Sequence, residues 1–195
     1  MSKTRLEAFS DGVIAILITI MVLELRPPHG TDFAVLRETL PAFLTYILSF
    51  VYLGIYWNNH HHMLHLTRRV TGGILWANLH LLFWLSLVPF VTAWMGENHN
   101  APQPTALYGG VMVLAAIAYT LLQRTIIARQ ADGKQLAVAI GGDLKGKVSI
   151  LLYVIAIPMA LWVDVRIADA LFVLVALIWF VPDTRIERGP VELSS

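Results

Sequence analysis

Arg5, Ser10 and Asp11 are the residues near the start of the chain whose types and spacing could do chemistry. Asp11 stands at the mouth of an apolar stretch, where a carboxylate is costly unless it is paired or stays at a membrane interface. From physical chemistry alone, the favoured interpretation is that Ser10 and Asp11 cap a helix while Arg5 reaches polar headgroups. A functional role for these three residues needs further support.

A second group consists of histidines, namely His60, His61, His62 and His65. The sequence contains no cysteine and no His-Glu-x-x-His pattern, so we predict packing or interface histidines and no metal site. A pH-sensing role stays open because histidine titrates near neutrality. A glycine-rich phosphate cradle, a Ser/His/Asp arrangement and a paired-carboxylate cleft are not recognisable either. We therefore expect no enzyme and no cofactor.

The segments that carry these residues are strongly apolar. Of the 195 residues, 57% are hydrophobic and 14% are charged, whereas soluble domains have roughly 45–50% apolar and about 25% charged residues. A soluble fold of this size could not bury so much apolar surface, which predicts an all-α, polytopic membrane protein in the lipid bilayer. The net charge of +1 gives no basic surplus for nucleic acid, so no nucleic-acid partner is expected.

Six apolar stretches predict six transmembrane helices, which form a single domain over residues 1–195. The stretches cover about residues 9–25, 40–57, 73–95, 105–123, 148–163 and 168–181. Pro89 should kink the third helix, and Asp164 should lie in a tight hairpin between the last two. The glycine-rich segment 131–147 is expected to be a long loop.

The basic residues predict how the chain is oriented. Eleven of the 14 Lys and Arg residues lie before the first stretch, after the sixth, or in the second and fourth connections; the other three are Arg26, Arg37 and Arg166. The positive-inside rule then places both termini in the cytoplasm, with the chain in the cell inner membrane. A cleaved signal peptide is disfavoured, because Asp11 interrupts its apolar region and no small-residue cleavage site follows.

The spacing Arg-x-x-x-Phe-Ser-Asp, formed by Arg5, Phe9, Ser10 and Asp11, resembles the signature of the transmembrane-protein-175 family. This family comprises potassium channels of endolysosomes and bacteria. Further residues resemble the family's second and third helices, namely Trp57, Asn58, His60, His61, Trp76 and Asn78, together with residues 89–92. The resemblance covers the first half of the chain and extends to the second half only through topology.

Membership of this family implies a homotetrameric channel that passes potassium and other monovalent cations. The first helix of each subunit lines the pore, and the matching gate positions are Ile16, Ile20 and Leu23, with Thr19 as their polar neighbour. On a helix, Asp11 points roughly 140° away from Ile16. We therefore expect Asp11 to face the bundle and to pair with Trp76, Asn78 or a histidine.

The sequence has no Thr-Val-Gly-Tyr-Gly loop, so we expect modest potassium selectivity. Two other functions stay open. A secondary transporter should show broken helices and polar residues at the bilayer midplane, in which these stretches are poor. A non-conducting membrane scaffold would fit the apolar composition equally well.

Overall fold

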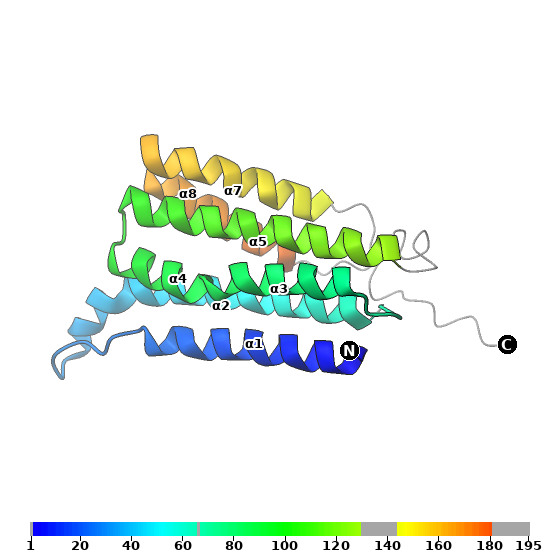
Figure 1. Ribbon diagram of the computed structural model, residues 1–195. Helices are drawn as coiled ribbons and strands as arrows, with labels where there is room; N and C mark the ends of the chain where they lie inside the picture. The colour runs from blue at the N-terminus through cyan, green and yellow to red at the C-terminus, as the bar shows by residue number, and fades with distance from the viewer. Residues whose placement is uncertain (1, 66, 130–143, 181–195) are drawn as a thin grey trace.

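Long helices lying side by side make up the described part of the chain, which is residues 2–65, 67–129 and 144–180 of the computed structural model (Figure 1). In chain order they are α1 (Lys3–Leu23), a 3-10 turn η1 (Phe33–Val35), α2 (Leu36–His65), α3 (Gly72–Ser86), α4 (Val88–Glu97), α5 (Pro102–Arg129), α7 (Leu144–Trp162) and α8 (Val165–Phe180). No strand occurs within the described residues. The all-α prediction is confirmed.

Five segments of the described chain are long and apolar enough to cross a membrane. They are Lys3–Leu23, Phe33–His65, Gly72–Glu97, Pro102–Arg129 and Leu144–Trp162. Helix α8 has 16 residues, is also strongly apolar and packs along α7. The membrane setting is thus supported, whereas the count of exactly six spanning helices stays a prediction.

The element boundaries differ from the predicted ones at three places. Helix α2 continues through the histidine cluster to His65. The third stretch is divided at Leu87, and Pro89 lies in the first turn of α4, where its missing N–H breaks no helical hydrogen bond. The prediction of a loop up to residue 147 is wrong at its end, because α7 begins at Leu144; residues 131–143 lie outside the described residues.

The predicted hairpin between the last two helices is confirmed. Helix α7 ends at Trp162 and α8 begins at Val165. The Asp164 carboxylate accepts a hydrogen bond from the backbone N–H of Arg166 at 2.8 Å, which caps the start of α8. A short capped turn of this kind holds the two helices antiparallel.

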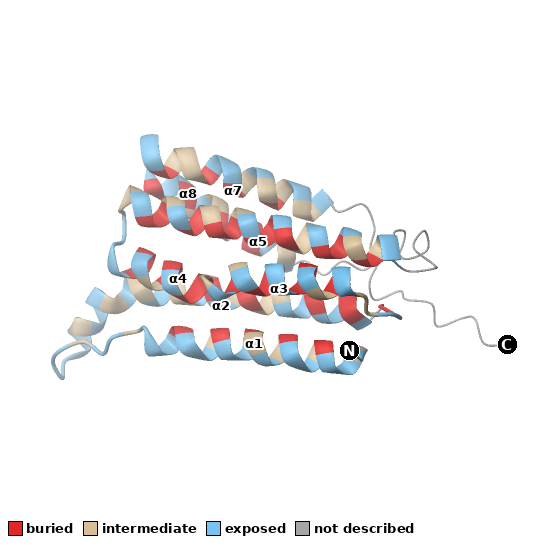
Figure 2. Ribbon diagram, viewed as in Figure 1, coloured by how far each residue is buried: buried red, intermediate tan, exposed pale blue. Residues whose placement is uncertain are grey.

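Helix α1 forms one edge of the bundle, where it packs on α2, α3 and α4 (Figure 1). On the other side, α5 contacts α3 and α4 and also packs against α7 and α8. A close approach joins α2 to α4, because a Cβ at Gly96 would stand only 2.9 Å from Ala42 Cα. The small residue therefore lets these two helices cross at short range. Buried residues follow the inner faces of all the helices (Figure 2).

Candidate functional site

Helix α1 starts before the polar motif and carries that motif in its interior. Ser2 is the N-cap, and its hydroxyl oxygen accepts from the backbone N–H of Arg5. The capping interpretation of Ser10 and Asp11 is therefore wrong, because both residues lie two turns or more inside the helix. Their side chains are free for contacts with neighbouring helices.

One face of α1 is packed against the other helices of the chain. Its buried residues recur every three or four positions, namely Leu6, Ser10, Ile14, Leu17 and Met21. This spacing puts them on a single stripe. The stripe faces α2, α3 and α4, which are the helices that α1 contacts.

The opposite face of α1 is exposed, although it is almost entirely apolar (Figure 2). Phe9, Ile16, Ile20 and Leu23 all lie on it, and Leu23 is 79% exposed. The positions expected to form the gate therefore share the side of α1 that points away from the rest of the chain. Such an apolar face needs either lipid or further copies of the chain to cover it.

Thr19 is exposed on the same side of α1. Its hydroxyl donates to backbone carbonyls of its own helix, at 2.9 Å to Ile16 and 3.1 Å to Ala15. Because the hydroxyl proton is used within the helix, the oxygen lone pairs are left to face outward. Thr19 thus presents an oxygen acceptor on this otherwise apolar face.

A buried chain of hydrogen bonds ties α1 to α3 and α2. The Asn78 amide donates to Ser10 Oγ at 3.0 Å, and the Ser10 hydroxyl donates to the Leu6 carbonyl at 2.9 Å. Because the amide nitrogen of Asn78 is bonded to Ser10, the amide oxygen faces His60. The distance from Asn78 Oδ1 to His60 Nε2 is 2.6 Å. His60 Nε2 must therefore carry the proton and donate it to Asn78 Oδ1. The three hydrogen bonds then donate in sequence from His60 to Asn78, from Asn78 to Ser10 and from Ser10 to the Leu6 carbonyl.

Asp11 makes a second polar contact with α2. Its carboxylate accepts a hydrogen bond from the indole Nε1 of Trp57 at 3.0 Å. The predicted partners were Trp76, Asn78 or a histidine, so that prediction is wrong. Trp76 is 76% exposed, and it lies two residues from Asn78, which turns the two side chains to different sides of α3.

The sequence did contain a signal for Trp57 as the Asp11 partner. Trp57 precedes His60 by three positions, so both lie on the same side of one helix. A partly buried indole N–H also needs an acceptor. Spacing within α2 could thus have grouped Trp57 with His60, but nothing in the sequence gave the rotation of α3 that turns Trp76 outward.

The other candidate residues lie outside this polar network. Arg5 is exposed, and so is His61, whose ring stacks between Trp57 and His65 with centroids 6.1 Å and 6.4 Å away. Within residues 2–65, 67–129 and 144–180, no three His, Asp or Glu side chains are grouped to hold a metal ion. The histidine cluster thus separates into His60, which is buried and hydrogen-bonded, and neighbours at the surface.

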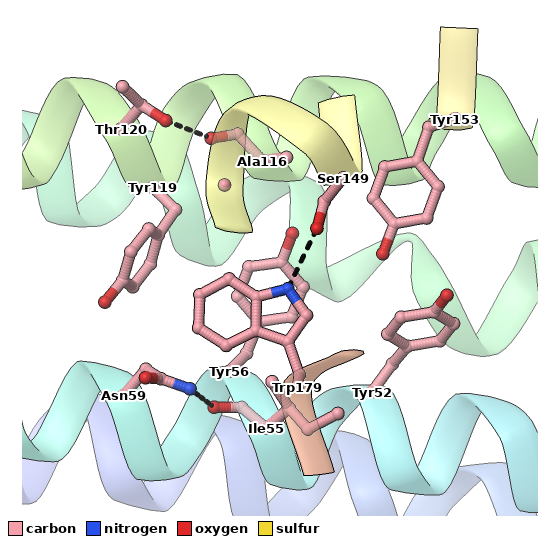
Figure 3. Close-up of a pocket in the computed structure, with 11 residues that line it drawn as sticks. Tyr52, Ile55, Tyr56, Asn59, Ala116, Tyr119, Thr120, Ser149, Tyr153 and Trp179 are labelled. Atoms are coloured by element: carbon pink, nitrogen blue, oxygen red, sulfur yellow. Dashed lines mark hydrogen bonds between the residues drawn. The ribbon is translucent and has the colours of Figure 1, made fainter. Parts of the chain in front are cut away.

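A small cavity of about 30 Å³ lies among α2, α5, α7 and α8 (Figure 3). Aromatic side chains, including those of Tyr52, Tyr119, Tyr153 and Trp179, surround it. The Trp179 indole donates to Ser149 Oγ at 2.9 Å. The volume suffices for about two water molecules and is too small for an organic substrate.

Comparison with known proteins gives consistent matches. Residues 5–89 match the family model described as endosomal/lysosomal potassium channel TMEM175. A protein of Chryseobacterium sp. described as a potassium channel is 53% identical over 192 residues, which cover 98% of this chain and all of that protein. A human protein described as an endosomal/lysosomal proton channel, TMEM175, is 28% identical over 158 residues, which cover 73% of this chain and 31% of the human protein.

The fold is similar to a solved structure as well. The crystal structure of a lysosomal potassium-selective channel TMEM175 homolog from Chamaesiphon minutus superposes with a TM-score of 0.79 and 26% identity, over 92% of this chain and 96% of that one. The sequence match over the full length of the Chryseobacterium relative and this shared fold agree with the motif in α1. The chain belongs to the TMEM175 family.

Proposed function

We propose that the chain forms a homotetrameric, potassium-permeable cation channel whose pore is lined by α1 and closed by a hydrophobic gate. Its bacterial relatives are described as potassium channels. The family is one of ion channels, which supports a role other than catalysis. The observation that carries the proposal is the exposed apolar face of α1, which holds Ile16, Ile20 and Leu23 at helical spacing.

Four copies of α1 around an axis would bring these faces together. A ring of Ile or Leu side chains offers an ion nothing in place of its hydration shell, so a narrow ring excludes water and blocks conduction. Removing such a ring should lower the barrier for permeation. Ile16, Ile20 and Leu23 would form successive rings one turn apart, with Thr19 between the first two.

Thr19 would supply the oxygen ligands of this pore. Its hydroxyl proton is bonded within α1, so a ring of four Thr19 oxygens could accept cations directly. A single ring replaces only part of a hydration shell, unlike the stacked carbonyl rings of a Thr-Val-Gly-Tyr-Gly filter, which this sequence lacks. We therefore expect potassium to be preferred over sodium only modestly.

The proposed channel unit is a single six-helix domain over residues 1–195, with α8 as the sixth span. Both termini would face the cytoplasm, in the inner membrane of the cell. The apolar hairpin of α7 and α8 supports an even number of spans. The concentration of Lys and Arg in alternate connections supports the orientation.

The test compares potassium flux from vesicles that contain Ile16→Asn or the wild-type chain. An amide in the gate ring should hydrate it and raise the flux at least about tenfold, which corresponds to about 1.4 kcal/mol of barrier. Ile117→Asn is the matched control, because Ile117 is an exposed isoleucine on α5, away from α1. This variant should leave the flux unchanged.

Equal fluxes from the two variants would place the exposed face of α1 against lipid and contradict the proposal. Planar-bilayer recording with potassium on one side and sodium on the other then separates the alternatives. Unitary ohmic currents indicate a channel, saturable coupled transport indicates a carrier, and silence from a folded tetramer indicates a scaffold.

A further inference from the structure

A groove of about 580 Å³ lies between α2 and α8, and none of its lining residues belongs to α1. Its long walls are apolar and include Leu44 and Leu48 from α2 and Val173 and Leu177 from α8. Leu44 and Leu177 are more than half exposed, so the groove opens sideways. In a chain that spans a membrane, a sideways opening faces the bilayer.

The groove has the length of one bilayer leaflet. Its lining runs from Leu40 to Val51 along α2 and from Asp169 to Phe180 along α8. Each run advances by eleven residues, or about 16 Å at the rise of an α-helix. Half of the hydrocarbon core of a bilayer is about 15 Å thick. An acyl chain would therefore fill the groove from end to end.

One end of the groove is polar. Asp169, one turn inside α8, lines it, and its Oδ1 atom is buried with no hydrogen-bond partner among the described residues. A carboxylate that borders an apolar groove without a hydrogen-bond donor is unfavourable, so the site favours a ligand that brings both a donor and a positive charge. His99 and Asn100, in the turn between α4 and α5, line the same end and offer N–H donors.

We propose that this groove binds phosphatidylethanolamine, with its primary ammonium on Asp169, its phosphate near His99 and Asn100, and an acyl chain along α2 and α8. The ammonium supplies the missing hydrogen bond and a complementary charge. Phosphatidylcholine has similar chains and the same net charge, but its quaternary ammonium has no N–H to donate. The carboxylate therefore selects between the two headgroups.

The experiment uses the full-length chain in phosphatidylcholine vesicles doped with either lipid carrying a photoactivatable acyl chain. On the wild-type chain, labelled phosphatidylethanolamine should cross-link to residues 40–51 and 169–180 about tenfold more than labelled phosphatidylcholine does. Tenfold corresponds to the lower range of a hydrogen bond to a charged group. This comparison needs no substitution.

Two variants sharpen the test. Asp169→Asn should weaken the headgroup preference, because it removes the negative charge and keeps only an uncharged amide oxygen as acceptor. Leu177→Trp should reduce cross-linking of both lipids by filling the groove. Asp164→Asn is the matched control, because Asp164 is an exposed acid at the same end of α8, and it should behave as the wild type does. Cross-linking of each variant is measured only in the size-exclusion fraction that elutes at the volume of the folded wild-type protein.

Three results would overturn the proposal. The two lipids could label the wild-type chain equally, the labelled peptides could lie outside both runs, or Asp169→Asn could keep the wild-type preference. A fourth result would come from a separate protein–protein cross-linking experiment: links between two copies of residues 169–180 would show that a second copy of the chain covers the groove, and they would also overturn the proposal. None of these outcomes depends on potassium flux, so the channel proposal is tested independently of the lipid proposal.

Discussion

The two sides of the bundle are held together in different ways. On one side, α1 is fixed by directional polar contacts, in which Ser10 and Asp11 bond to Asn78 and Trp57. On the other side, α5, α7 and α8 converge on aromatic rings. Phe172 has 0% exposure, and its ring centroid lies 5.1 Å from that of Tyr108 and 6.2 Å from that of Tyr153.

This difference indicates that packing on one side stabilises the bundle, whereas polar contacts on the other side set the orientation of α1. Lipid tails are as apolar as the side chains, so close packing is the main force that joins α5, α7 and α8. Packing of aliphatic residues alone would hold α1 at several similar rotations. The hydrogen bonds that Ser10 and Asp11 accept from Asn78 and Trp57 specify one of these rotations. That rotation decides that Ile16, and not Ile14, faces away from the rest of the chain.

The largest expected effect is on the aromatic side. Phe172→Ala should lower the free energy of unfolding by about 3–5 kcal/mol, because it leaves a cavity between Tyr108 and Tyr153. Denaturant titration in detergent measures the loss. Phe83→Ala is the control, since Phe83 is exposed on α3 and makes no such cavity. Equal losses of unfolding free energy in both variants would show that Phe172 contributes no more to packing than an exposed phenylalanine does.

A smaller effect is expected where α1 is anchored. Asn78→Leu leaves the N–H of His60 buried without an acceptor, which should lower the free energy of unfolding by about 1–3 kcal/mol. It should also change the potassium flux from vesicles, because the rotation of α1 is released.

Asn59→Leu provides the matched control for Asn78→Leu. The Asn59 amide donates to the Ile55 carbonyl of its own helix at 2.8 Å. Removing this amide therefore breaks no hydrogen bond between helices. The control should leave the flux as it is in the wild type. A changed flux in Asn59→Leu, or an unchanged flux in Asn78→Leu, would contradict the assignment of α1 orientation to the interhelical bonds.

The sequence predicted the features that depend on local pattern. Apolar runs located the helices, Pro89 located the break between α3 and α4, and Asp164 located the last hairpin. The periodicity of α1 also set Asp11 on a different side from Ile16. Each of these follows from residue type and spacing within one segment, without knowledge of a neighbour.

Contacts between segments were harder to predict. The partner of Asp11 depends on how α2 and α3 are rotated, and both helices carry a tryptophan near a histidine or an asparagine. Nearly uniform hydrophobicity around α3 gives no periodic signal for its rotation. The choice of Trp57 over Trp76 is therefore a property of packing that the sequence pattern does not contain.

The contact between Asp11 and Trp57 should contribute less than the buried network, because Asp11 is only partly buried and Trp57 is exposed. We expect Asp11→Ala and Trp57→Phe each to lower the free energy of unfolding in detergent by about 0.5–1.5 kcal/mol, the contribution of one hydrogen bond. The double variant should lose little more than either single one. Additive losses would show that the two side chains act independently.

The same two variants test whether Asp11 takes part in conduction. The carboxylate points toward α2, away from the exposed face of α1. The reversal potential between potassium and sodium should therefore stay at the wild-type value in both variants. A shift in Asp11→Ala alone would mean that this charge reaches the ion path.

The smallest effect is expected beyond the C-terminal end of α1. Arg26, just beyond α1, pairs with Glu97 at the end of α4 at 3.0 Å, and both side chains are exposed. Glu97→Gln should lower the free energy of unfolding by less than about 1 kcal/mol, and the difference should vanish at about 1 M salt, where the screening length is near 3 Å. Thermal unfolding at low and high salt measures the difference in unfolding free energy.

A loss that persists in high salt and equals that of Asn78→Leu would mean that the surface ion pair anchors α1 as firmly as the buried hydrogen bonds do. Because water and salt screen the pair but not the buried bonds of Ser10, we expect the ion pair to add little to the rotation that the hydrogen bonds of Ser10 and Asp11 set.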